Sequence, residues 1–215
     1  MAIPFSGERQ GVLMGVRCFM VRPTERCRAS LRRYWGGEDC GGSYHNAETP
    51  IGELPAIRNA DGYYLANPVD PYLSDPRWPA KCDKCGAPVP ESAERQIFTK
   101  IIYVDPAAKE YSLRAPVPGM MWDAWWMGES MHGPDGKCLV VICPDGTEWM
   151  IDGHASNCTM PNDSGPFDKA HRCWVRHGEP PNITVDKNGR TCSAGAGSIV
   201  GHKGYHGFLR NGEFT

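Results

Sequence analysis

The segment Lys81-Cys82-Asp83-Lys84-Cys85-Gly86 constrains this chain more than any other stretch of its sequence. Two cysteines three positions apart, on a turn relaxed by the following glycine, can direct both sulfurs at one metal ion about 2.3 Å away. A tetrahedral structural site needs two more ligands, and the glycine-rich segment 40–45 offers a cysteine and a histidine. The sequence therefore predicts one closed structural zinc site formed by Cys40, His45, Cys82 and Cys85. The choice of Cys40 and His45 is less constrained by the sequence than that of Cys82 and Cys85.

Two other interpretations of the same cysteine pair are a redox dithiol and a disulfide. A thioredoxin-like motif follows a strand and opens a helix. Here Pro79 precedes the pair and the proline-containing segment 86–90 follows it, so a helix cannot begin at Cys85. This context favours zinc over a redox pair, and a disulfide remains as a third possibility.

The chain has 215 residues, ten cysteines and a formal net charge of −2. A charge this close to zero gives no general attraction to nucleic acid or to anionic lipid. The cysteines form disulfides if the chain is secreted, and act as ligands or buried thiols if it is cytosolic. The apolar run at 11–16 is too short for a secretory signal, and no run approaches the roughly eighteen apolar residues of a membrane span. We therefore expect a protein made in a cytoplasm, with neither a membrane nor nucleic acid as its partner.

Residues 24–34 have the pattern of an amphipathic helix, with Pro23 at a position that suits the first turn. The apolar residues Cys27, Leu31 and Tyr34 recur at the i, i+4 and i+7 spacing of one helical face. This interpretation places Cys27 in the core, away from the metal.

From residue 120 onward the sequence is typical of antiparallel hairpins, and a strand pair is expected before it. Residues 97–104 are dense in β-branched and aromatic residues, with 111–117 as the expected partner. The strongest hairpin signal is the apolar run 138–143, which turns through Pro-Asp-Gly into 148–152. Further hairpins are expected around Asp61-Gly62, between 182–185 and 191–193, and between 205–209 and 213–215.

Together these signals predict a mainly β fold of the α+β class: an antiparallel, hairpin-rich sheet, a zinc-knuckle region and one amphipathic helix. The expected division is into a zinc-knuckle lobe, 1–110, and a hairpin-rich β lobe, 111–215, which can also form one continuous domain.

A second concentration of potential ligands lies between residues 154 and 192. Cys158, Cys173 and Cys192 can form a second zinc site with one of the nearby histidines, or a disulfide, or remain buried thiols. Their spacings of fifteen and nineteen residues match no compact zinc finger, so the sequence leaves these alternatives open. The nearby histidines are His154, His171 and His177.

The segment 120–127 combines three tryptophans with three methionines. Both residue types are enriched at the centres of protein interfaces, so Trp122, Trp125 and Trp126 are candidate anchors for a partner. The alternative is that they fill the core, as most such residues do.

The sequence contains no signature of a zinc deaminase, a zinc protease, a serine-hydrolase nucleophile elbow or a phosphate-binding loop. We therefore expect no catalytic residues and a non-enzymatic protein.

Several unusual segments resemble a known family. They are YHNAE (44–48), DPRWPAKCDKCG (75–86), MWDAWWM (121–127), ASNCTMPND (155–163), HRCWVRHGEPP (171–181) and GYHGFLRNGE (204–213). Spread over most of the chain, they are similar to an uncharacterised protein family of tailed phages and prophages, which has no assigned activity. The resemblance implies a viral product made in the cytoplasm of a host bacterium, where structural zinc suits cysteines better than disulfides do.

Two classes of function are compatible with these observations. The first is a non-enzymatic structural component of a tailed-phage virion, such as a capsid decoration, minor capsid, connector or tail-associated subunit, with other virion proteins as partners. The second is a cytoplasmic phage protein: a zinc-stabilised nucleic-acid-binding module or a hydrolase of unrecognised type. The binding module would use Arg26, Arg28, Arg32 and Arg33, but the net charge of −2 weakens it. We therefore expect the structural component, located in the virion.

Overall fold

The computed structural model describes residues 15–37, 40, 44–128, 131–155, 157–158, 171–189, 191–194 and 198–215. In these ranges the chain is mainly β, and its helical segment is the three-residue 3-10 turn η1 (Asp70–Tyr72). No helix in the described ranges is a candidate membrane span. The chain divides into two compact units. We call residues 21–115 the knuckle unit, and the described residues up to 20 and from 116 onward the hairpin unit.

The boundaries of these units differ from the predicted division at residues 110/111. Residues 15–20 belong to the hairpin unit, where β1 (Val16–Arg17) pairs with β17 (Glu213–Phe214), the last strand of the chain. The described chain therefore starts in the hairpin unit, forms the knuckle unit as one continuous insertion, and returns at residue 116.

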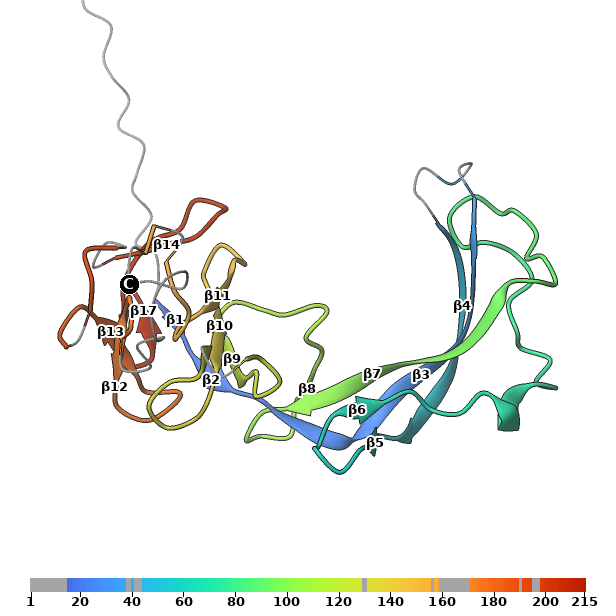
Figure 1. Ribbon diagram of the computed structural model, residues 1–215, viewed down its shortest axis with the longest axis horizontal. Helices are drawn as coiled ribbons and strands as arrows, with labels where there is room; N and C mark the ends of the chain where they lie inside the picture. The colour runs from blue at the N-terminus through green and yellow to red at the C-terminus, as the bar shows by residue number, and fades with distance from the viewer. Residues whose placement is uncertain are drawn as a thin grey trace, which may run out of the picture. The chain divides into compact units, whose positions relative to one another are not determined.

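The knuckle unit is built on three long antiparallel strands, which lie side by side in Figure 1. The central strand is β3 (Arg22–Gly36), with β4 (Tyr44–Pro55) on one side and β7 (Glu94–Val104) on the other. The short β8 (Glu110–Tyr111) pairs with the end of β7. At about 3.4 Å per residue the 15 residues of β3 extend for roughly 50 Å, well beyond a typical strand of about 5–6 residues.

The predicted amphipathic helix at 24–34 is wrong, because this segment is the middle of β3. Cys27 and Leu31 are four residues apart, a spacing that puts them on one face of a helix and also on one face of a strand. The strand buries the odd-numbered Cys27, Ala29 and Leu31 and exposes Arg28 between them. The segment adopts the alternating burial of a strand instead of the periodicity of a helix, because β4 and β7 supply hydrogen-bonding partners for its backbone. The expected burial of Cys27 in the core is confirmed.

The core of the knuckle unit lies between the buried face of this sheet and the proline-rich connector 66–80. Leu31 and Ile97, from adjacent strands, are at its centre, and the connector covers them with Tyr72 and Trp78. The indole Nε1 of Trp78 donates a hydrogen bond to the carbonyl oxygen of Tyr72 at 2.6 Å. A core this small supplies limited stability by itself.

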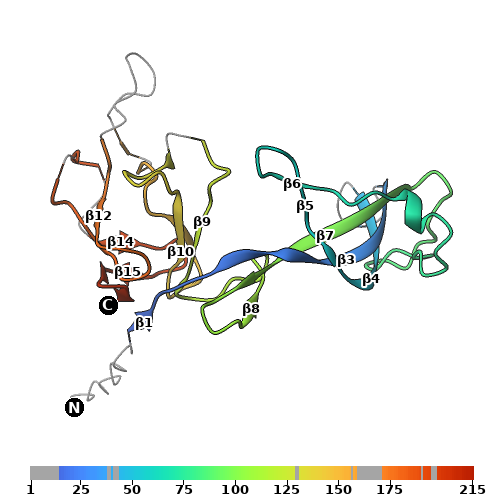
Figure 2. The same cartoon turned by 90° about the horizontal axis from the view of Figure 1, so that it is seen from below.

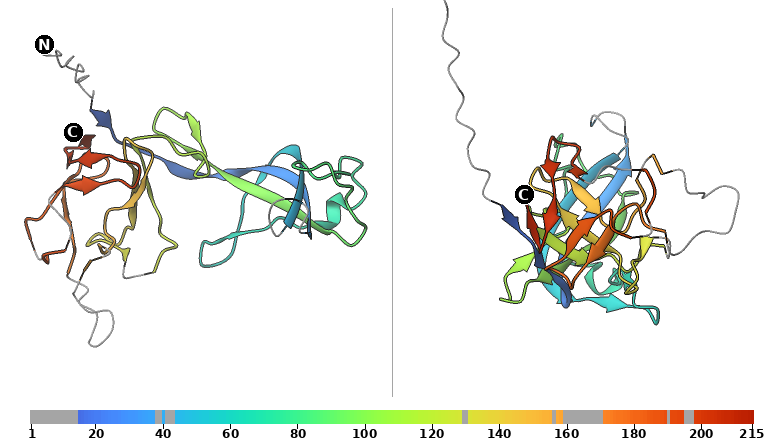
Figure 3. Two further views of the ribbon diagram at one scale, coloured as in Figure 1. Left: turned by 90° about the horizontal axis from the view of Figure 1, so that it is seen from above. Right: turned by 90° about the vertical axis from the view of Figure 1, so that its left-hand side faces the viewer.

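The hairpin unit contains several small sheets. Their strands are β2 (Phe19–Met20), β9 (Met120–Asp123), β10 (Leu139–Ile142), β11 (Glu148–Met150), β12 (Val175–His177), β13 (Thr184–Asp186), β14 (Ile199–Val200), β15 (His206–Gly207), β16 (Leu209–Arg210), β1 and β17. One sheet has the order β11-β10-β9-β2, with β2 parallel to β9 and β10 buried on both faces. Another joins β1 to the C-terminal hairpin of β16 and β17, whose strands are red in Figure 3. The remaining pairs are β12 with β13 and β14 with β15.

The core of the hairpin unit forms where these sheets pack together. Apolar side chains from six of the short strands and from the loops between them contribute to it. They are Cys18, Met121, Leu139, Val141, Cys143, Ile151, Ile183, Val185, Ile199, Leu209 and Phe214.

Most of the predicted hairpins are confirmed. The β10–β11 and β16–β17 pairs form across the turns expected from Pro-Asp-Gly and Asn-Gly. The hairpin of β5 (Ile57–Arg58) and β6 (Tyr64–Leu65), labelled in Figure 2, flanks Asp61-Gly62 as expected. The predicted pairing of 182–185 with 191–193 is wrong. Instead β13 pairs with the preceding β12, and residues 191–194 form no strand.

Candidate metal centres

The four residues predicted as zinc ligands lie close together in the knuckle unit, with their ligand atoms all within 4.8 Å of one another. The Sγ atoms of Cys40 and Cys82 are 3.6 Å apart, and Sγ of Cys85 is 3.3 Å from Nδ1 of His45. Zinc bonds of about 2.3 Å to sulfur and about 2.0–2.1 Å to nitrogen place tetrahedral ligands about 3.8 Å apart for two sulfurs and about 3.5 Å apart for sulfur and nitrogen. The donors of this first cluster are therefore spaced to share one ion.

The knuckle turn is fixed by backbone hydrogen bonds. The amide of Gly86, at φ +73°, donates to the carbonyl oxygen of Cys82 at 3.0 Å and closes the turn. The amide of Asp83 donates to the carbonyl oxygen of Asn46 at 2.9 Å, and Oδ2 of Asp83 accepts from the amide of Glu48 at 2.9 Å. These last two bonds hold the turn against β4, the strand that carries the histidine ligand.

The imidazole of His45 is oriented by Trp35 on β3 and by Gly37, the first residue after that strand. Trp35 is directly opposite on that strand, and the two rings stack with centroids 4.9 Å apart and planes 5° apart. On another side of the ring is Gly37, where an added β carbon would lie 2.4 Å from Nε2 of His45. The stacked tryptophan and the space left by the glycine together allow Nδ1 of His45 to face Cys85.

Replacing Gly37 with alanine is expected to weaken metal binding at the first cluster. The new methyl group would take the space of the His45 ring and turn the imidazole away from the sulfurs. Displacement of groups that orient a ligand typically costs about 10–100-fold in metal affinity. The matched control is Gly36→Ala, because a β carbon there meets nothing within 4 Å. Chelator competition measures the effect, and equal affinities of the two variants would contradict the expectation.

Burial and hydrogen bonding separate the acidities of the thiols in the first cluster. Cys40, His45 and Cys82 are buried and Cys85 is exposed. Backbone hydrogen bonds from Cys85 and Lys84 lower the pKa of Cys82 to about 5, although burial opposes them. Burial raises the pKa of Cys40 to about 11, together with contacts to the other two sulfurs. The thiolate of Cys82 is thus available at neutral pH, and a bound cation would ionise Cys40.

A second cluster of donors lies in the hairpin unit. The Sγ atom of Cys158 is 3.4 Å from Nε2 of His171 and 3.8 Å from Sγ of Cys192. The Sγ atom of Cys173 is 3.7 Å from the same nitrogen and 3.8 Å from Cys192. His154 also contributes a donor, which lies with those of Cys158, His171 and Cys173 inside a 4.8 Å group. The structure therefore brings the three predicted cysteines together and adds two histidines.

The sequence could not select these two histidines from the three candidates. His177 is on β12 and takes no part in the cluster, because its Nε2 lies 2.9 Å from Oδ1 of Asp186 on the paired strand. Cys192 is ionised more readily than its neighbour. Burial opposes its ionisation, but a backbone hydrogen bond from Ala194 and the adjacent thiols lower its pKa, whereas burial raises the pKa of Cys173 to about 12.

The ten cysteines all lie in described residues, and none of them forms a disulfide. Three belong to each cluster, and the remaining four are buried thiols: Cys18, Cys27, Cys138 and Cys143. Burial raises the pKa of Cys18 and Cys143 to about 12 and that of Cys138 to about 11, which keeps these thiols neutral. The described residues thus contain two Cys/His clusters that could hold a metal ion.

The three candidate interface tryptophans lie in different environments. Trp122 on β9 is only 3% exposed, so it is a core residue and not the partner anchor that the sequence suggested. Trp125 is half-buried and meets Trp126 edge to face, with centroids 6.0 Å apart. Trp126 is 37% exposed and offers an accessible indole.

Comparison of the sequence with protein-family models and curated proteins gives no match, and comparison of the fold with solved structures gives none either. A function is therefore proposed from the residues and geometry of this chain.

Proposed function

We propose that this chain is a non-enzymatic structural protein, stabilised by zinc, that binds other proteins in the virion of a tailed phage. The observation that carries the proposal is the complete donor set of Cys40, His45, Cys82 and Cys85. Four protein ligands at tetrahedral spacing leave no position for water or substrate, as in structural rather than catalytic zinc sites. Three thiolates and an imidazole favour zinc over the oxygen-binding cations magnesium and calcium.

The virion assignment is supported by the resemblance of six sequence segments to tailed-phage and prophage proteins. A virion subunit needs surfaces that neighbours can bind, and the knuckle sheet has one along the outer edge of β4. Apart from its hydrogen bonds to Asp83, this edge pairs with no described strand, and Tyr44 at its start is 68% exposed. A free sheet edge can accept a strand from a partner. Trp126 is a further candidate anchor in the hairpin unit.

The alternative of a nucleic-acid-binding module is weakened by the contacts of its four candidate arginines on β3. Arg33 is buried and donates to the backbone carbonyl oxygens of Pro90, Glu91 and Ala93. The other three pair with glutamates, which leaves little unbalanced positive charge for phosphates. These pairs are Arg26–Glu53 (2.8 Å), Arg26–Glu110 (2.8 Å), Arg28–Glu110 (2.8 Å) and Arg32–Glu48 (3.2 Å).

The alternative of a hydrolase has one contact in its favour. Oγ of Ser198 lies 2.7 Å from Nε2 of His206, as in a nucleophile and its base. This pair is on the exposed β14–β15 hairpin, and no carboxylate among the described residues hydrogen-bonds to the histidine to orient it. A serine and a histidine on an exposed hairpin, without the carboxylate of a catalytic triad, favour a surface hydrogen bond over a catalytic site.

Mass spectrometry of purified virions tests the proposal. Peptides of this chain are expected in particles at a constant ratio to the major capsid protein, through repeated purification by density gradient. A host cytoplasmic protein of similar abundance in the lysate serves as the control and should be removed. Abundance in infected cells combined with absence from particles would refute the virion assignment.

A further inference from the structure

The second cluster contains more donors than one tetrahedral ion requires. Its members come from three separate stretches of the hairpin unit, around residues 154–158, 171–173 and 192. Two complete sets of four can be drawn from them. Both contain Cys158, His171 and Cys173, and the fourth member is Cys192 in one set and His154 in the other.

The distances distinguish a shared metal ion from a disulfide. Cys192 lies 3.8 Å from both Cys158 and Cys173. A disulfide brings two sulfurs to about 2.05 Å, whereas two sulfurs on one tetrahedral zinc are about 3.8 Å apart. Equal separations from two cysteines are expected around an ion and not for a bond to one of them. The contacts of Nε2 of His171, 3.4 and 3.7 Å, also match the sulfur–nitrogen spacing of about 3.5 Å.

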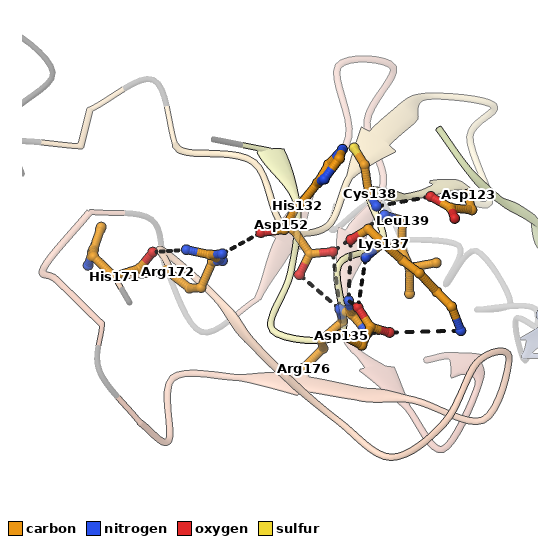
Figure 4. Close-up of polar contacts among 10 residues, drawn as sticks. All are labelled: Asp123, His132, Asp135, Lys137, Cys138, Leu139, Asp152, His171, Arg172 and Arg176. Carbon is orange, nitrogen blue, oxygen red and sulfur yellow. Dashed lines mark hydrogen bonds and ion pairs between the residues drawn. The ribbon is translucent and has the colours of Figure 1, made fainter. Parts of the chain in front are cut away.

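Basic side chains outside the cluster hold the backbone at two of the three shared donors, His171 and Cys173. Nη1 of Arg172 donates to the carbonyl oxygen of His171 at 2.6 Å, and its Nη2 donates to that of His132, as Figure 4 shows. Nζ of Lys187 donates to the carbonyl oxygen of Cys173 and, at 2.7 Å, to that of Ala194. The lysine therefore ties the segment that carries Cys192 to the segment that carries Cys173.

We propose that the second cluster is a zinc site in which Cys158, His171 and Cys173 are permanent ligands, Cys192 is the resting fourth ligand, and His154 can replace Cys192. Zinc imposes no geometric preference from its d electrons and accepts thiolate or imidazole in the same position. In the exchange the zinc–sulfur bond of Cys192 breaks, and its sulfur takes a proton from a water molecule, which leaves hydroxide in the solvent. A ring nitrogen of His154 then donates its lone pair to the metal.

Charge decides which of the two is the resting ligand. With Cys192 bound, three thiolates give the zinc site a net charge of −1, and with His154 bound the site is neutral. The ammonium group of Lys187 lies between the Cys173 and Ala194 segments and favours the negative form. His154 lines a cavity of about 420 Å³ together with Trp149, Trp174 and His202. Its donor atom already lies within 4.8 Å of those of Cys158, His171 and Cys173, so only a short displacement separates it from the ion.

Counting zinc in four forms of the full-length chain tests the proposal. Wild type is expected to hold two ions, one for each cluster. Cys192→Ala should still hold two, with the second released several-fold faster to a chelator, because His154 takes over. His154→Ala should behave as wild type, and the double variant should hold one. His202→Ala is the control, since this histidine lines the same cavity but lies outside the donor group.

Cobalt substitution keeps the test valid if the double variant does not fold. In Cys192→Ala the visible bands of tetrahedral cobalt should persist. The sulfur-to-cobalt charge-transfer band should lose about one sixth of its intensity, because one of the six thiolate ligands is removed. Loss of a whole site in this single variant would overturn the exchange. A wild-type chain whose Cys158, Cys173 and Cys192 react freely with a thiol reagent would overturn the site itself. Cys82→Ser removes only the ion of the first cluster. A negative result for zinc at the first cluster can therefore be distinguished from a negative result for the second cluster.

Discussion

A Cys82→Ser variant is expected to purify with one zinc ion fewer than the wild-type chain and with the knuckle unit unfolded. The serine hydroxyl does not ionise at neutral pH, so the variant lacks one of the four ligands. The core of this unit is small, with Leu31 and Ile97 at its centre. Structural zinc contributes about 10–16 kcal/mol in zinc-finger peptides, as much as the whole stability of about 5–15 kcal/mol of an ordinary domain. Little would hold the unit together without it.

Elemental analysis and limited proteolysis measure this effect. Cleavage should increase within residues 21–115 and remain unchanged in the described part of the hairpin unit. Cys85→Ser should behave in the same way. The control is Cys27→Ser, a buried cysteine of the same unit that belongs to neither cluster and whose Sγ lies 3.4 Å from the carbonyl oxygen of Leu54, where a hydroxyl can donate. Full zinc content in Cys82→Ser would contradict a metal site at the first cluster.

The grouping of the first cluster was predictable because the information is local. The spacing of Cys82 and Cys85 and the glycine after them determine the geometry of the turn. Cys40 lies in the short connection between β3 and β4, and His45 is the second residue of β4, so chain proximity brings them together. The orienting contacts of Trp35 and Gly37 with the His45 ring depend on strand register, which the sequence does not display.

The fold of residues 24–34 was not predictable from its own pattern. Cys27 and Leu31 fit both periods, and arginine, alanine and leucine are good helix formers. What decides the structure is pairing with β4, the next strand along the chain, and with β7, which is distant in sequence. The same limit applies to the second cluster, since the choice of His154 and His171 over His177 depends on how the strands of the hairpin unit pack.

An Arg176→Ala variant is expected to lose about 3–5 kcal/mol of stability in the hairpin unit, because it leaves a buried carboxylate without its partner. The side chains of Arg176 and Asp152 are only 5% and 2% exposed. Nε of the arginine lies 2.8 Å from Oδ1 of Asp152, and Nη1 lies 3.0 Å from Oδ2 of Asp135 (Figure 4). Gly133 packs against the pair, where an added β carbon would lie 2.6 Å from Asp152. The site therefore has no room to reorganise around the lost guanidinium.

The pH dependence of this loss distinguishes the ion pair from simple packing. Hydrogen bonds from Arg176 lower the pKa of Asp135, so the stability from this contact is present above the ordinary carboxyl pKa and is lost as pH falls through the folded-state pKa. Burial raises the pKa of Asp152 despite the arginine, so this group becomes neutral at a higher pH than an ordinary carboxyl. The difference in unfolding free energy between variant and wild type should therefore be greatest at neutral pH and shrink in acid. Protonation of the thiols affects both chains equally, so it cancels when one free energy is subtracted from the other.

Lys137→Ala is the matched control for the Arg176 substitution. Its Nζ is 4.0 Å from Asp135, and its side chain is 46% exposed. A solvated ion pair of this kind contributes about 0–1 kcal/mol, so this variant should unfold at nearly the denaturant concentration of the wild type. Both differences are measured by denaturant titration at a series of pH values. If the two variants lost similar stability, or if the loss in Arg176→Ala did not change between neutral and acidic pH, the buried ion pair would not be what stabilises this part of the hairpin unit.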